Sequence, residues 1–114
     1  MKPEIAEKWI KALRSGDYIQ GKDKLKNNIF FCCLGVLCEI AVKEGIIEPS
    51  IDGIDEYGGR SSYPPFEVYS SWAGMNNKYG NINCIGISLP VLNDSGNMSF
   101  EQIADIVEAN VENI

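Results

Sequence analysis

The sequence predicts an α+β fold in which a buried central helix and two or three amphipathic helices pack on a small antiparallel sheet. Residues 31–42 are apolar on nearly every helical face, which is typical of a helix inside a core. Apolar residues recur at helical spacing near both ends of the chain, and short alternating stretches between them indicate strands. The length of 114 residues suits a single domain, residues 1–114, and not two.

The first element is predicted to be an amphipathic helix over residues 3–13. Ile5, Trp9 and Leu13 lie four residues apart, so they share the face that we expect to be buried. Gly16 then provides a residue that readily adopts the left-handed backbone with which many helices end.

A short strand over residues 18–20 and a polar loop over residues 21–24 are expected next. Leu25 is the one residue of this loop region that we expect to be anchored inward. The central helix follows over residues 31–43, and Glu39 is the only charged residue in its apolar part.

The second half of the chain is predicted to be less regular. Glycine-rich residues 51–62 indicate hairpins or an ordered loop, and residues 63–73 indicate a short helix that begins at a proline. Residues 81–87 alternate as a strand does, and residues 88–96 begin as a helical turn. The segment 99–102, Ser-Phe-Glu-Gln, is a capping box that begins a final amphipathic helix.

The chain is acidic, with a net charge of −6, but this charge is unevenly distributed. Residues 1–26 carry seven basic and four acidic side chains, whereas residues 27–114 carry three basic and twelve acidic ones. Proteins that bind long nucleic acids usually present a basic surface, so no such partner is expected. The basic N-terminal segment can still hold one small anion. No apolar run is long enough to cross a membrane, and we expect a cytoplasmic protein with reduced thiols.

Four cysteines suggest chemistry that the rest of the sequence does not support: Cys32, Cys33, Cys38 and Cys84. A nucleophilic cysteine needs an adjacent base, and the chain has no histidine. Zinc ligands are usually separated by a few residues in the chain, but Cys32 and Cys33 are adjacent. Because the side chains of two adjacent helical residues point roughly 100° apart, both thiols can rarely bind one zinc ion. We therefore expect no catalytic residue, no metal and no cofactor, and thiols that pack as small apolar groups.

Acidic residues leave open a different hypothesis, an enzyme that uses carboxylates and a divalent metal. Asp52, Asp55 and Glu56 cluster in the glycine-rich loop, and Asp94 lies in a predicted turn. The loop lacks the alternating ligands and late glutamate of a Ca²⁺ site, so a solvated loop explains it better. The enzyme hypothesis would therefore depend on Asp94.

Phosphate binding is the chemistry that the basic and aromatic residues fit. Lys22 and Lys24, with the backbone amides beside them, can hold one or two phosphates, although an ordinary surface loop also explains them. Arg60 can pair with a phosphate, and Tyr57 or Trp72 can stack on a base. Ordinary packing in the core is the alternative explanation for the aromatic rings.

Three blocks of sequence occur in a recognisable order. The first is W-I-K-A-L-R-S-G at residues 9–16, followed by Tyr18, Q-G-K at 20–22 and Leu25; the second is F-C-C-L-G-V-L-C-E at 31–39; the third is L-N-D-S-G at 92–96 with S-F at 99–100, I-A at 103–104 and Ile106. In these blocks the chain resembles a widespread group of small phage- and prophage-encoded proteins, while residues 46–88 match nothing in that group. No general biochemical activity is established for that group, so the resemblance carries over no catalytic residues.

Small accessory phage proteins commonly counter host defence, and one class consists of sponges that sequester nucleotide immune signals. The resemblance therefore implies a non-enzymatic protein that binds a cyclic oligonucleotide or an ADP-ribose derivative without cleaving it, in the cytoplasm of the infected bacterial host. We expect such a protein to be a homo-oligomer if its pocket lies between subunits. The alternative is an acidic adaptor that binds and inhibits a host protein.

The residues expected to contact the nucleotide-type ligand are polar, basic or aromatic. They are Tyr18, Gln20, Lys22, Lys24, Tyr57, Arg60, Trp72, Asn93 and Asp94. Gln20, Asn93 and Asp94 are included because they are polar residues of the matched blocks. A packing requirement explains the apolar residues of these blocks easily, but it explains the polar ones less well.

Overall fold

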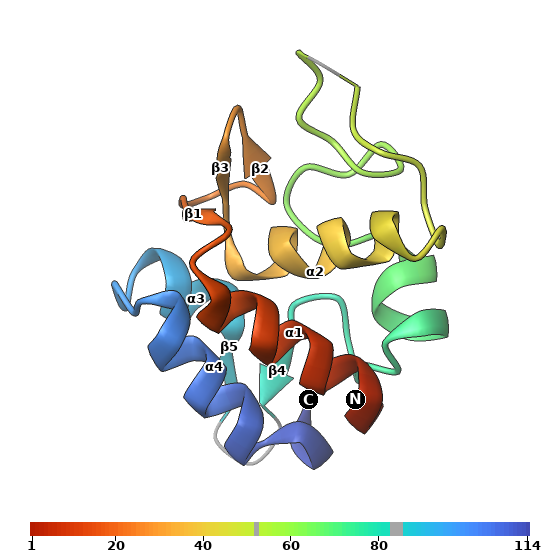
Figure 1. The fold of residues 1–114 in the computed structure, drawn as a ribbon. Coiled ribbons are helices and arrows are strands. Elements are labelled where there is room, and N and C mark those ends of the chain that lie inside the picture. Colours follow the sequence, from red (N-terminus) through yellow and green to blue (C-terminus); the bar gives the residue numbers. More distant parts are fainter. Residues whose placement is uncertain (52, 83–85) are drawn as a thin grey trace.

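The computed structural model describes residues 1–51, 53–82 and 86–114, and it has the predicted α+β fold (Figure 1). Its elements are, in chain order, α1 (Pro3–Ser15), β1 (Ile19–Gln20), β2 (Lys26–Asn27), β3 (Phe30–Phe31), α2 (Cys33–Lys43), η1 (Glu67–Trp72), β4 (Asn81–Ile82), β5 (Ile87–Ser88), α3 (Leu89–Asp94), α4 (Phe100–Ala109) and η2 (Val111–Asn113). Here η1 is a π-helical segment and η2 a 3₁₀ turn. No helix in the described part of the chain is both long and apolar enough to cross a membrane.

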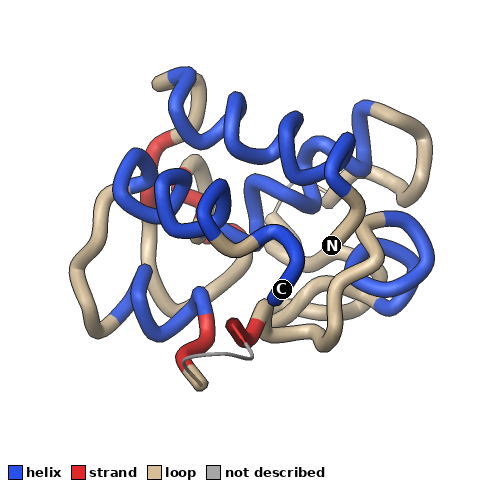
Figure 2. The backbone as a smooth tube through the Cα atoms, turned by 90° about the horizontal axis from the view of Figure 1, so that it is seen from below, coloured by secondary structure: helices blue, strands red, loops and turns tan. Residues whose placement is uncertain are grey.

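Helix α1 packs on α4 and on α2 (Figure 1), and the two chain ends lie side by side (Figure 2). The Met1 amine donates hydrogen bonds to the carbonyl oxygens of Val111 (3.2 Å) and Ile114 (3.1 Å). The face of α1 that the apolar spacing predicts is the buried one. Gly16 ends the helix with a φ of 79°, which confirms the predicted left-handed stop.

Helix α2 forms the centre of the core, as its apolar sequence predicts. Eight of its eleven residues are buried, and the indole N–H of Trp9 donates to the carbonyl oxygen of Cys33 at 2.9 Å. The helix begins at Cys33, later than predicted, because Phe30 and Phe31 form strand β3.

The predicted antiparallel sheet is replaced by two small sheets, one of which contains a parallel pair. In the first sheet β3 lies between β1 and β2, and it runs antiparallel to β2 and parallel to β1. The β2–β3 hairpin occupies one edge of β3, so only the other edge is left for β1. The second sheet is the antiparallel pair β4–β5.

Two predictions in the second half need correction. The helix predicted over residues 63–73 is the shorter η1, because a residue that precedes a proline disfavours the helical backbone and Pro64 and Pro65 follow Tyr63. The strand predicted over residues 81–87 is instead β4 and β5, and residues 83–85 between them lie outside the described part of the chain. The capping box that begins α4 is confirmed.

A close contact between α2 and the loop before it sets the position of the central helix. Leu25 is fully buried, as predicted, and its carbonyl oxygen accepts the N–H of Cys32 at 3.2 Å. A Cβ atom on Gly35 would lie 1.7 Å from that carbonyl oxygen. No larger residue fits at this position unless the backbone moves.

Overpacking of a core commonly costs about 1–3 kcal/mol and occasionally more. We expect Gly35→Ala to lower the free energy of unfolding by about 3 kcal/mol or more, because the 1.7 Å contact is with backbone and only a backbone shift can relieve it. The measurement is equilibrium unfolding in urea. Gly45→Ala is the control, because Gly45 has a positive φ of 74° but open space around it, and it should lose only about 1–2 kcal/mol. Equal losses in the two variants would contradict the proposed backbone contact.

Candidate functional site

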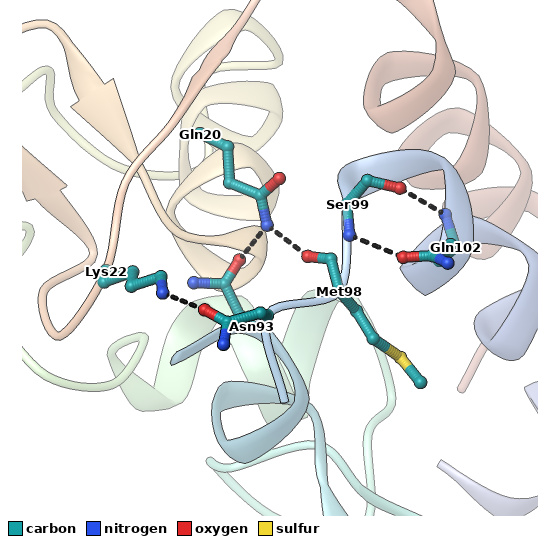
Figure 3. A pocket seen from close by; sticks show the side chains of 7 residues that line it. Gln20, Lys22, Asn93, Met98, Ser99 and Gln102 are labelled. Carbon is teal, nitrogen blue, oxygen red and sulfur yellow. Dashed lines mark hydrogen bonds between the residues drawn. The ribbon is translucent and has the colours of Figure 1, made fainter. Parts of the chain in front are cut away.

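A surface pocket of about 340 Å³ lies where the end of β1 meets the segment that joins α3 to α4 (Figure 3). It is lined by Gln20, Lys22, Asn93, Asn97, Met98, Ser99 and Gln102. Three predicted ligand residues, Gln20, Lys22 and Asn93, are among these, and Asp94 is the neighbour of Asn93. The fold therefore brings together four of the predicted residues from the two ends of the chain.

The Gln20 side chain joins β1 to the segment before α4 (Figure 3). Its Nε2 donates to Asn93 Oδ1 at 2.9 Å and to the carbonyl oxygen of Met98 at 2.7 Å. Its Oε1 accepts the N–H of Phe100 at 3.1 Å. All the polar atoms of this side chain thus have partners within the protein.

Asn93 is the only buried polar or charged residue among those that the structure describes. Its Nδ2 donates to the carbonyl oxygen of Gly21 and to Asp94 Oδ1, both at 2.8 Å. Asp94 Oδ1 also accepts the N–H of Asp23 at 3.0 Å. These contacts, with those of Gln20, form a clamp that holds the chain after β1 against α3. A structural role therefore accounts for Gln20, Asn93 and Asp94.

The other lining residues leave hydrogen-bond donors available to a ligand. Lys22 Nζ donates to Asn97 Oδ1, so the amide oxygen of Asn97 faces Lys22 and the N–H₂ group of Asn97 stays available to a ligand. Gln102 Oε1 accepts the N–H of Ser99 at 3.0 Å, and Ser99 Oγ accepts the N–H of Gln102 at 3.2 Å. The Gln102 N–H₂ and the Ser99 O–H have no partner in the described part of the chain. No carboxylate of the residues that the structure describes lines the pocket, so the chemistry of this lining suits an anion.

Three lining residues, Asn97, Ser99 and Gln102, are not among the site residues that the sequence predicts. The S-F-E-Q motif does predict Ser99 and Gln102 as a helix start, and each keeps one donor after it forms the cap. Asn97 has a φ of 51°, a backbone that asparagine tolerates better than most residues, but no local pattern predicts that it lies near Lys22.

Five predicted ligand residues lie away from the pocket, and Tyr18 and Lys24 are two of them. The Tyr18 hydroxyl accepts a hydrogen bond from Lys43 Nζ at 3.0 Å, which raises the pKa of Lys43. Lys24 lines a different depression, beside Asp55 and Glu56. Neither side chain lines the pocket that Lys22 lines.

Tyr57 was expected to stack on a base, and its position corrects that expectation. The side chain is fully buried, and its hydroxyl donates to Glu39 at 2.6 Å. Two causes raise the pKa of Tyr57: burial is the larger, and this hydrogen bond to Glu39 is the second. Trp72 is half-buried and packs against the core. Arg60 is exposed and lies beside the ring of Tyr63, outside the pocket.

The thiols of Cys32, Cys33 and Cys38 are buried and free. Burial raises the pKa of Cys32 to about 11 and raises the pKa of Cys33 and Cys38 as well, so these thiols are neutral and unreactive near neutral pH. Cys84 and Asp52 lie outside the described residues. Within the described residues, no group of three or more acidic or cysteine side chains is placed to hold a metal ion.

We expect Gln20→Ala and Asn93→Ala each to lower the free energy of unfolding by about 1–3 kcal/mol, because each leaves polar groups of the clamp without a partner. The double variant should lose less than the sum, since the two amides contact each other. Asn97→Gly keeps the positive φ, removes an exposed side chain of the same pocket, and should change stability by less than about 0.5 kcal/mol. Strictly additive losses would argue against the clamp.

The α2 thiols should resist iodoacetamide in the folded protein and react rapidly in guanidinium chloride, as measured by peptide mass spectrometry. The raised pKa of Cys32 also predicts that stability falls as pH rises from the ordinary thiol value of 9.0 to about 11, because the unfolded chain loses its proton first. Rapid labelling of Cys32 under native conditions would contradict the inert role.

Comparison with known proteins identifies the domain but no activity. A family model described as Domain of unknown function (DUF8296) matches residues 1–111. The match includes every residue that lines the pocket and both sides of the clamp. No curated protein matches the chain, and no solved structure does.

Proposed function

The chain belongs to the DUF8296 family, and we propose that it is a non-enzymatic binding protein that sequesters a nucleotide-derived signal in the pocket between β1 and α4. The observation that carries this proposal is the lining of the pocket, which offers hydrogen-bond donors and no carboxylate although the chain has a net charge of −6. Phosphate oxygens accept such bonds, and a bond to an ionised group is stronger than one between neutral groups. This lining favours a phosphorylated ligand over a cationic one.

The volume of the pocket suits a small ligand, which we take to be one nucleotide unit. At about 340 Å³ it lies near the lower end of the range for small-molecule sites, about 300–1,000 Å³. Lys22 would contact the phosphate, Asn97 and Gln102 would donate to the base or sugar, and the Met98 side chain would lie against the base. A cyclic oligonucleotide contains several such units, so binding it would use the pockets of two or more copies in a symmetric homo-oligomer.

The lining of the pocket supports binding of the ligand without cleavage. The lining residues include no carboxylate, thiol or imidazole, which are the usual groups for acid–base or nucleophilic chemistry. The Ser99 hydroxyl already accepts the N–H of Gln102 as a helix cap. The resemblance to phage proteins supplies the setting: the ligand is an immune signal, and the protein acts against host defence in the cytoplasm of the infected bacterium.

A second candidate function, an adaptor that binds a host protein, has a separate observation in its favour. A groove between α1 and α4 has an apolar floor that includes Ala6 and Ile10, and Glu7, Glu108 and Glu112 border it. No lysine or arginine lines this part of the groove. A basic, partly apolar segment of a partner protein would complement it.

The first test is the thermal unfolding of the purified protein with cyclic dinucleotides, cyclic trinucleotides and ADP-ribose isomers, each in large excess. A ligand at 100 times its dissociation constant adds about 2.7 kcal/mol, which raises the Tm of a domain of this size by several degrees. A selective shift without ligand breakdown supports sequestration. Breakdown of the ligand would overturn it, and the absence of any shift would favour the adaptor.

Lys22→Gln should weaken the binding of a shifting ligand by about tenfold to a hundredfold, because it removes a charge-assisted hydrogen bond to phosphate. Lys24→Gln is the matched control, since it makes the same change of charge two residues away but lies on a different depression. Isothermal titration calorimetry measures both dissociation constants. Equal weakening in the two variants would mean that general charge, and not this pocket, holds the ligand.

A further inference from the structure

Four side chains outside the pocket form a second group with binding chemistry, here called the aromatic–cation cluster: Arg60, Tyr63, Lys78 and Tyr79. Lys78 Nζ lies 3.9 Å from the centre of the Tyr63 ring and 5.2 Å from that of Tyr79. Arg60 Cζ lies 5.6 Å from the Tyr63 ring centre. The two rings are 6.0 Å apart and inclined at 69°. Two cations and two aromatic rings therefore meet from separate segments of the chain.

The backbone that carries Arg60 and Tyr63 is tightly held. Tyr57 and Arg60 exchange two backbone hydrogen bonds of 2.9 and 3.0 Å, which close a turn of two glycines, and the buried Tyr57 anchors that turn in the core. Tyr63 precedes Pro64, which restricts its backbone to extended conformations, and Pro64 is itself buried.

The turn that carries Lys78 and Tyr79 is held in a similar way. Asn77 Oδ1 accepts the N–H of Tyr79 at 3.0 Å and the N–H of Asn81 at 3.2 Å. Because Asn81 begins β4, this side chain ties the turn to the second sheet. Side chains on such fixed segments lose little freedom when a ligand arrives, which favours binding.

The two cations of the cluster have no acidic partner. The chain has sixteen acidic residues, yet neither Arg60 nor Lys78 forms an ion pair with any carboxylate in the described part of the chain. A ring face holds an exposed cation only weakly, so both remain available to an anion. Tyr79 is 44 % exposed, so its ring is available to a flat partner.

We propose that the aromatic–cation cluster is a second binding site, which takes the base and phosphate of a nucleotide unit. The base stacks on Tyr79, and Arg60 and Lys78 pair with the phosphate, because stacking tolerates any base and guanidinium matches phosphate geometry. The cluster shares no residue with the pocket, and this inference does not depend on the pocket binding anything. The unit can belong to a free nucleotide or to a short single strand, since both present the same chemistry.

The test is fluorescence anisotropy with two labelled probes, AMP and a ten-residue deoxythymidine strand. We expect Tyr79→Ala to weaken binding by about fivefold to a hundredfold and Tyr79→Phe to retain it, because the phenyl ring still stacks. Lys78→Gln should weaken binding and reduce its dependence on salt. Since Tyr79 is exposed, all three variants should keep the melting temperature of the original protein, which shows that they fold.

Lys22→Gln separates this site from the pocket. Binding of the probes that survives Lys22→Gln but not Tyr79→Ala supports the second site, whatever the pocket does. Tighter binding of the strand than of AMP would identify a strand as the source of the nucleotide unit, and equal binding would identify a free nucleotide. Binding of neither probe, or loss with Lys22→Gln alone, would overturn the proposal.

Discussion

Two side-chain amides, those of Gln20 and Asn93, join the N-terminal sheet to the C-terminal helices, and the arrangement around the pocket depends on this contact. Asn93 is buried with its polar atoms paired, and an unpaired amide at such a position costs about 1–3 kcal/mol. The observed placement of β1 against α3 satisfies all of these bonds, so the clamp favours that placement. The position of Lys22 opposite Asn97 follows from it.

In the folded chain the basic residues of the N-terminal segment do not form a single basic surface, because some of them pair with carboxylates from later in the sequence. Lys8 pairs with Glu44 at 2.8 Å, and Arg14 pairs with Asp105 at 2.7 Å and with Glu108. These exposed pairs contribute little stability, but they neutralise two of the cations that lie together in the N-terminal segment of the sequence. Lys22 at the pocket and Arg60 and Lys78 at the aromatic–cation cluster are among the cations that form no ion pair with a carboxylate in the described part of the chain.

The candidate site was only partly predictable from the sequence. Chemistry identified Gln20, Lys22 and Asn93, but the pocket also needs side chains whose role depends on folding. Lys24 carries the same charge as Lys22 and diverges from it because Asp23 between them has a φ of 70°, which turns the chain. Tyr57 looks like an exposed ring in a glycine-rich loop, yet it fills the core and bonds to Glu39, because the loop folds back over α2.

Residue order alone was enough to predict α1, α2 and α4, because apolar spacing, the Gly16 stop and the Ser99 cap act within one or two turns of a helix. The strands were less predictable, since each has two residues, and the place of β1 depends on which edge of β3 the β2–β3 hairpin leaves free. The convergence of β1 with the segment after α3 likewise has no local signal. Distant segments compete for the same space and hydrogen bonds, and that competition is resolved only when the whole chain packs.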